Sequence, residues 1–242
     1  RMNLLNTKRL CSAANATWPA MSVRQHEGWD IRDGAGAGKR VSAATLALDG
    51  WTDIAPAEQA MQALGQEMLF MIREGETELD MRLEVRGYKI IDPVIIYACK
   101  NALLAPKLLP VAQSYAIWEP LQVMREIWAM GGINAERIAL MHRVKAPKTG
   151  LLARSADTPA GTAFVALNGD IAMIHAVEVL QSFRRTGVAR KLMAQAAKWA
   201  QDNGATYMSL MTTAKNVAAN ELYQSMGMKP VGHYHYRKKE ST

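Results

Sequence analysis

The feature that most constrains this chain is a strand that runs through a cationic turn directly into an amphipathic helix, over residues 177–192. Apolar residues recur at helical spacing after the turn, until Gly204 ends the pattern. The first N–H groups of such a helix have no partner within it and carry partial positive charge. Cations crowd the same end, namely Arg184, Arg185, Arg190 and Lys191. A bound phosphate or pyrophosphate would make this crowding favourable, and a solvated basic helix start is the alternative.

A second block of sequence follows the helix. Residues 205–213 have a strand pattern, a short helix is expected between Asn216 and Gly227, and residues 231–237 alternate like another strand. The two blocks together resemble the GNAT superfamily of acyl-CoA-dependent N-acetyltransferases. The resemblance covers residues 112–242 and is carried by two motifs, Arg184-x-x-Gly187-x-Ala189 and Asn216-x-x-Ala219-x-x-Leu222-Tyr223-x-x-x-Gly227-Met228.

The resemblance implies an α/β (α+β) protein with the GNAT fold, in which helices flank a mixed, mostly antiparallel sheet. The patterns along residues 112–242 agree with a catalytic acetyltransferase domain of this kind. A helix is expected over residues 120–130, and Asn168-Gly169 is a strong hairpin signal. Strands are expected at 139–144, 149–154, 161–167 and 171–180.

The N-terminal half contains a weak echo of the C-terminal half. Residues 79–88 precede an apolar run that ends at Tyr97, much as residues 222–228 precede a strand that ends at Tyr236. Aligning Gly87 with Gly227 places Leu83 opposite Tyr223, and no phosphate turn occurs in the matching place upstream. We therefore expect a duplicated fold in which residues 1–111 form a degenerate GNAT-like domain. A non-homologous α/β cap is the alternative, and Pro106 and Pro110 mark the expected boundary.

The resemblance also implies how acetyl-CoA binds. In GNAT enzymes the strand before the turn pairs through its backbone with the pantetheine arm, and the N–H groups of the turn hold the pyrophosphate. Glycine at position 187 permits close approach of the pyrophosphate to the backbone. Asn216 matches a position that contacts the cofactor, and an Asn before a helix is in addition a good N-cap. The matching positions are Val177, Val179, Arg184, Arg185, Thr186, Gly187, Val188, Ala189, Arg190, Asn216 and Tyr223.

The chemistry that the resemblance implies is direct attack of a neutral amine on the thioester in a ternary complex. Tyr223 matches the tyrosine that protonates the departing thiolate, although its ring also suits packing. Glu178 is the first candidate for the base, with His175 or a water chain as alternatives. Met211 stands where ribosomal-protein alanine acetyltransferases carry Glu, which argues against that acceptor class. A non-catalytic acyl-CoA sensor or interaction module is the alternative function.

Composition narrows the partners to acetyl-CoA and an amine acceptor, with a homodimer left open. The net charge of +7 favours a polyanion, which coenzyme A satisfies, and no zinc-finger or aromatic RNA-binding motif indicates nucleic acid. No apolar run is long enough to predict a membrane span. Two cysteines favour a reducing cytoplasm, and the histidine spacing predicts no metal cofactor.

A glycine-rich stretch at residues 33–40 superficially resembles a phosphate loop. Asp33 stands where the first glycine is required, and Arg40 stands where Ser or Thr would bind magnesium. We therefore expect a turn here and no nucleotide site.

Overall fold

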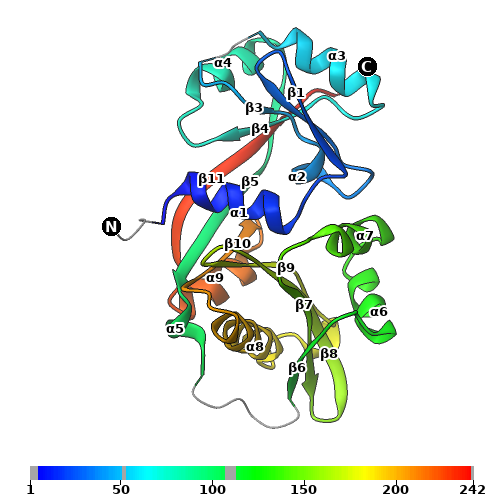
Figure 1. The fold of residues 1–242 in the computed structure, drawn as a ribbon, viewed down its shortest axis with the longest axis vertical. Coiled ribbons are helices and arrows are strands. Elements are labelled where there is room, and N and C mark those ends of the chain that lie inside the picture. Colours follow the sequence, from blue (N-terminus) through cyan, green and yellow to red (C-terminus); the bar gives the residue numbers. More distant parts are fainter. Residues whose placement is uncertain (1–4, 51–52, 107–112, 241–242) are drawn as a thin grey trace.

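The computed structural model describes residues 5–50, 53–106 and 113–240. An eight-stranded sheet runs through both halves of the chain, and a smaller three-stranded sheet, formed by residues of the N-terminal half, lies at one end of the molecule (Figure 1). The elements of the N-terminal half are α1 (Thr7–Thr17), β1 (Ser22–His26), β2 (Trp29–Asp33), α2 (Lys39–Ser42), β3 (Thr45–Leu46), α3 (Ala55–Ala63), β4 (Leu69–Arg73), α4 (Thr77–Val85), β5 (Lys89–Lys100) and α5 (Asn101–Leu104).

The C-terminal half supplies most of the large sheet and the helices that cover it. Its elements are β6 (Ser114–Ile117), α6 (Gln122–Met130), α7 (Ala135–Arg143), β7 (Lys148–Ser155), β8 (Thr158–Asn168), β9 (Ile171–Val179), the 3-10 helix η1 (Gln181–Phe183), α8 (Val188–Asp202), β10 (Tyr207–Thr213), α9 (Val217–Ser225) and β11 (Lys229–Lys238).

The large sheet has the strand order β4-β11-β5-β10-β9-β8-β7-β6. Every neighbouring pair is antiparallel except β9 and β10, which are parallel. The expected mixed and mostly antiparallel sheet flanked by helices is therefore confirmed. The turn at Asn168-Gly169 joins β8 to β9, as the sequence predicted.

The two halves exchange their last strands. β5 of the N-terminal half pairs with β10, and β11 of the C-terminal half pairs with β4. The two exchanged strands also pair with each other, as the second and third strands of the sheet, and they run between the halves (Figure 1). As a result, neither half completes its part of the sheet from its own residues.

The helix that precedes each exchanged strand, and the register of the strands around it, recur at a constant offset along the chain. α4 begins at Thr77 and α9 begins at Val217, 140 residues later, and both helices have nine residues. Strand register follows the same offset, because β4 pairs Arg73 with Tyr234 while β10 pairs Thr213 with Val94. At the helix ends the Tyr88 N–H donates to the Leu83 carbonyl, and the Met228 N–H donates to the Tyr223 carbonyl.

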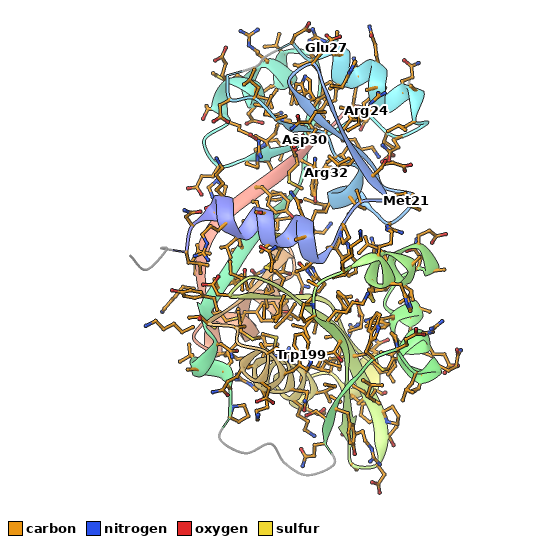
Figure 2. All side chains as sticks on the ribbon, in the orientation of Figure 1. Met21, Arg24, Glu27, Asp30, Arg32 and Trp199 are labelled. Carbon is orange, nitrogen blue, oxygen red and sulfur yellow. The ribbon has the colours of Figure 1, made fainter. Side chains whose placement is uncertain are left out.

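Helices from both halves cover the large sheet. α8 packs on one face through the residues expected from its spacing, including Val188, Leu192 and Ala196, all at most 1% exposed. α6 and α7 pack on the opposite face around Trp128. α1 of the N-terminal half contacts β8, β9 and β11. Figure 2 shows Trp199 of α8 and Arg24 of β1 in opposite halves of the molecule.

One strand prediction is wrong. Residues 139–144 belong mainly to helix α7, because the Asn134 side chain caps that helix by accepting a hydrogen bond from the Arg137 N–H. Leu140 and Met141 are buried, and they share a short apolar run that fits a helix as well as a strand. The predicted domain boundary at 111/112 and Pro110 lie outside the described residues. In the described part of the chain, no helix combines the length and apolar character that crossing a bilayer requires.

Candidate functional site

The site begins where the parallel pair β9–β10 separates. The two strands pair from Tyr207 and Ile171 up to Leu210 and Ile174, and no further. Beyond this point β9 continues to pair with β8, whereas residues 211–213 of β10 continue to pair with β5. A bulge at Ala176, with φ of 51°, accompanies the divergence. Residues 177–179 therefore have a backbone edge that faces the gap and has no ladder partner in β10.

Side chains after the bulge alternate between the two faces of β9. Val177 and Val179 pack against the core that contains α8, while Ala176 and Leu180 pack against the core under α6 and α7. Alternation places Glu178 on the second face. The segment expected to pair with pantetheine is thus part of β9, with both valines directed toward α8, and its contact with the cofactor stays a prediction.

The cationic turn follows directly, and its conformation depends on glycine. Gly187 is the N-cap of α8 with φ of 88°, and a Cβ at this position would meet no atom within 4 Å. The space beside it is therefore open to a ligand. The Thr186 hydroxyl closes the turn by donating to the Phe183 carbonyl at 2.7 Å, and Arg184 Nε donates to the Val179 carbonyl at 3.3 Å.

The start of α8 has the donors that the sequence predicted. The N–H of Lys191 donates to the Gly187 carbonyl, so the amides of Val188, Ala189 and Arg190 precede the first intrahelical bond. Val188 itself is buried, while Arg185 and Arg190 are exposed. The Arg190 guanidinium donates to Ser225 Oγ at 2.6 Å, which ties the turn to α9.

Tyr223 lies on α9 within the same core as α8 and the two valines of β9. Its side chain is 6% exposed, and its ring centroid lies 5.9 Å from that of Tyr97. Burial and the nearby negative charge of Glu178 raise the pKa of the Tyr223 hydroxyl to about 12. The hydroxyl therefore keeps its proton at neutral pH.

Asn216 is the N-cap of α9, and its side chain accepts a hydrogen bond from the Ala219 N–H at 3.3 Å. The capping role is confirmed. A contact between Asn216 and the cofactor stays a prediction.

Glu178 is half-buried and lies directly on Gly131, the C-cap of α6. A Cβ on Gly131 would collide with the Glu178 carboxyl group. Burial raises the pKa of the Glu178 carboxyl above its ordinary value, and the charges of Arg184 and Arg137 oppose this shift. A carboxylate with a raised pKa is a better proton acceptor, and the role of Glu178 as base stays a prediction.

His175 is held in one protonation state. The Thr17 hydroxyl donates to the Ala13 carbonyl at 2.7 Å, so it must accept from His175 Nε2, which lies 2.8 Å away. Nδ1 then accepts from the Arg40 guanidinium at 3.4 Å. Burial, followed by the Arg40 charge, lowers the pKa of His175 well below its ordinary value. The ring is neutral and stacks on Trp18, which makes it a weak candidate for the base.

A cavity of about 260 Å³ opens where β9 and β10 separate. The separating strands supply His175, Ala176 and residues 211–213. The rest of the wall comes from both halves, namely Trp18, Ala37, Gly38, Lys39, Arg40, Asp92, Val94, Ile133, Arg137, Tyr234 and Tyr236.

Comparison with known families agrees with this geometry. Residues 116–228 match the acetyltransferase (GNAT) family. This part of the chain belongs to the GNAT family. An uncharacterized N-acetyltransferase of Bacillus subtilis (strain 168), YobR, is 23% identical over 237 residues, which cover 93% of this chain and 95% of that protein.

Solved structures share the fold of this GNAT protein over nearly its full length. A GCN5-related N-acetyltransferase from Kribbella flavida is 19% identical, with a TM-score of 0.72 over 99% of this chain and 98% of that chain. A tandem GNAT protein from the clavulanic acid biosynthesis pathway is 11% identical, with a TM-score of 0.56 over 88% of this chain and 79% of that chain.

Sequence reasoning missed the N-terminal residues that line the cavity of this acetyltransferase. Arg40 belongs to the glycine-rich stretch that we expected to be only a turn, and its side chain lines the cavity. Tyr234 and Tyr236 could have been found, because the alternation of the last strand places both on one face. No local pattern indicates that Trp18 lies near β9.

Proposed function

We propose that this acetyltransferase moves an acetyl group from acetyl-CoA to an amine by direct attack within a ternary complex. The observation that carries the proposal is the gap between β9 and β10. It adjoins the core that holds Tyr223, and β9 leads from it into the Gly187 turn. A pantetheine arm paired with residues 177–179 would bring the thioester to this gap while the turn holds the pyrophosphate.

The proposed reaction forms one bond and breaks one. The amine nitrogen attacks the thioester carbonyl carbon, the new C–N bond forms, and the C–S bond breaks. Glu178, directly or through water, accepts the proton that the nitrogen loses, and the Tyr223 hydroxyl donates a proton to the departing sulfur. The products are an N-acetylated amine and coenzyme A.

We also propose that residues 1–111 are a degenerate GNAT copy and that residues 112–242 form the catalytic domain. The constant offset of 140 residues between α4 and α9, and between their strand registers, supports a duplication. Leu83 is the counterpart of Tyr223, so the N-terminal copy has no phenol for catalysis. We expect one acetyl-CoA per chain, because the phosphate turn has no N-terminal counterpart.

The test of the proposal uses two glycines at opposite ends of α8. Gly187 and Gly204 both have left-handed φ values, 88° and 83°, and a Cβ at either would meet nothing within 4 Å. The variants Gly187→Glu and Gly204→Glu therefore carry similar backbone strain. Calorimetry should show that only Gly187→Glu abolishes acetyl-CoA binding, because its carboxylate occupies the pyrophosphate position. If the wild-type protein has no affinity for acetyl-CoA at low salt, the proposal fails.

A further inference from the structure

The cavity at the β9–β10 gap is positively charged, and the N-terminal half supplies much of that charge. Lys39, Arg40 and Arg137 line it, against a single carboxylate, Asp92. We infer that the acceptor is a small amine that carries a carboxylate, and that Arg40 binds this carboxylate. The inference rests on the proposed acetyl transfer and specifies the class of its second substrate.

The other two cations of the cavity already have partners. Lys39 Nζ lies 2.7 Å from Asp92, which also accepts from Lys215 at 2.6 Å. Arg137 donates to the carbonyls of Ala37 at 3.1 Å and Gly132 at 3.2 Å. Their donors hold the loop of residues 37–40 in place, so neither is the obvious anchor for a ligand.

Arg40 differs from Lys39 and Arg137 because its hydrogen-bond partner is a histidine nitrogen and not an oxygen. Within residues 5–50, 53–106 and 113–240, no carboxylate lies within 4.0 Å of its guanidinium, and the partner found there is His175 Nδ1, at the long distance of 3.4 Å. The side chain is half-buried. A guanidinium that has lost part of its hydration without gaining an anionic partner is unfavourable, and a carboxylate can accept two parallel hydrogen bonds from it.

The wall of the cavity also places the amine. Arg40 contacts His175, and His175 and Ala176 form the edge of the gap where the thioester is expected. A molecule bound to Arg40 through its carboxylate can therefore direct an amine toward that edge. Trp18, Tyr234 and Tyr236 provide apolar surface for the carbon skeleton between the two groups.

The size and charge of the cavity restrict the acceptor further. A volume of about 260 Å³ lies below the roughly 300–1,000 Å³ typical of drug-sized ligands. Lys39 pairs with Asp92, and Arg137 donates to two backbone carbonyls, which leaves Arg40 to match one negative charge, as a carboxylate supplies. Polyamines carry only positive charge, and the three cations of the cavity would repel them.

The test compares amines that differ only in the carboxylate. A panel of amino acids, with their amides and their decarboxylated amines, is offered to the wild-type enzyme with acetyl-CoA, and coenzyme A release is measured. We expect kcat/KM for the best carboxylate to exceed that for its amide at least tenfold. Equal rates with the amide or the decarboxylated amine would overturn the inference and leave the proposed function standing. Failure of acetyl-CoA binding in calorimetry would instead refute the proposed function.

Variants at Arg40 link the preference to this side chain. Arg40→Met keeps much of the stem and removes the charge, so KM for the carboxylate should rise at least about tenfold while its kcat and the acetyl-CoA affinity change little. Arg40→Lys should restore part of the preference. The matched control is Arg24→Met, on the exposed strand β1, which supplies no residue to the wall of the cavity. An Arg40→Met enzyme that retains the preference, or that loses activity equally toward carboxylates and amides, contradicts the inference.

Discussion

Tyr223 and Tyr97, whose ring centroids lie 5.9 Å apart, allow a catalytic role to be distinguished from a stabilising one. Tyr223→Phe should retain acetyl-CoA affinity and lower kcat by roughly ten- to a thousand-fold, because the hydroxyl acts only as the sulfur leaves. Tyr97→Phe should leave kcat nearly unchanged and lower the free energy of unfolding. The Tyr97 hydroxyl donates to Asn220 Oδ1 at 2.9 Å and accepts from Gln224 Nε2 at 2.9 Å. A Tyr223→Phe enzyme with wild-type turnover would show that this tyrosine only packs.

Gly131 gives an indirect way to test the base. Its φ is −86°, which alanine adopts readily, but an added Cβ must displace the Glu178 carboxyl group. The carboxyl is the far end of a flexible side chain, so we expect Gly131→Ala to retain the wild-type stability and to lower kcat/KM at least tenfold. The loss should vanish in a Glu178→Gln background, because both changes then remove the same group. Equal losses from Gly131→Ala in both backgrounds would exclude this mechanism.

The pH profile provides a second readout for Glu178. A base must be deprotonated to act, so kcat/KM should rise with pH through the pKa of Glu178, which burial raises above its ordinary value. Tyr223 should cause no alkaline decline near neutrality, because its pKa is about 12. Displacing the carboxylate into solvent with Gly131→Ala should move the acidic limb to lower pH.

For individual residues, the sequence predicted the turn and the helices that hold Gly187 and Tyr223, but it did not predict the N-terminal residues that line the cavity. Gly187 and Tyr223 lie in local motifs, where spacing along the chain determines position on a turn or a helix. Arg40 and Trp18 reach the cavity only through tertiary packing of the N-terminal half, and neighbouring residues contain no signal for that. The tautomer of His175 likewise depends on Thr17, which is 158 residues away along the chain.

The exchanged strands are held by equivalent side-chain contacts. Arg237 Nε of β11 donates to Asp80 of α4 at 2.7 Å, and the Tyr97 hydroxyl of β5 donates to Asn220 of α9. Position 237 is the counterpart of 97, and position 220 is the counterpart of 80, at the same offset of 140 residues that relates α9 to α4. Each contact joins a strand from one half to a helix from the other half.

Asp80→Ala should therefore destabilise the fold by about 1–3 kcal/mol, because the buried Arg237 loses its hydrogen-bonded carboxylate and is left with the more distant carboxylate of the exposed Glu84, at 3.9 Å. Urea unfolding measures the effect, and Glu78→Ala on the exposed side of α4 is the control, with no measurable change expected. Burial opposes ionisation, but hydrogen bonds from Arg237 and His235 lower the pKa of Asp80 overall. The stability that Asp80 contributes is therefore fully present above the pKa of this carboxyl in the unfolded chain, and it is lost as pH falls through its lower pKa in the folded protein. Equal effects of both variants at neutral pH would refute the role of Asp80.

The sequence indicated both Gly-ended helices and the strands after them, but it could not show the exchange. β5 and β11 follow equivalent helices, and their apolar patterns are compatible with the same neighbours. Which strand pairs with β4 and which with β10 depends on contacts more than a hundred residues apart. Local propensity contains no information on that choice.

For the whole molecule, the shared sheet predicts one cooperative unfolding transition. β5 of the N-terminal half pairs with β10 and β11 of the C-terminal half, and β11 pairs with β4 and β5 of the N-terminal half, so opening one half exposes strands of the other. Differential scanning calorimetry should give a calorimetric enthalpy equal to the van't Hoff enthalpy. Two separate transitions, each with its own enthalpy, would mean that residues 1–111 and 112–242 unfold independently despite the exchange.

The exchange also reverses the usual order in which a nascent chain folds. β5 ends at Lys100, whereas its neighbours begin at Tyr207 and Lys229, so the ribosome makes β5 long before either neighbour exists. At ordinary rates of synthesis the wait is on the order of ten seconds. During that time both edges of an apolar strand are exposed and can pair with other chains. The N-terminal half therefore cannot finish folding while it is being translated, and β11, which is made after the other seven strands of the large sheet, completes that sheet.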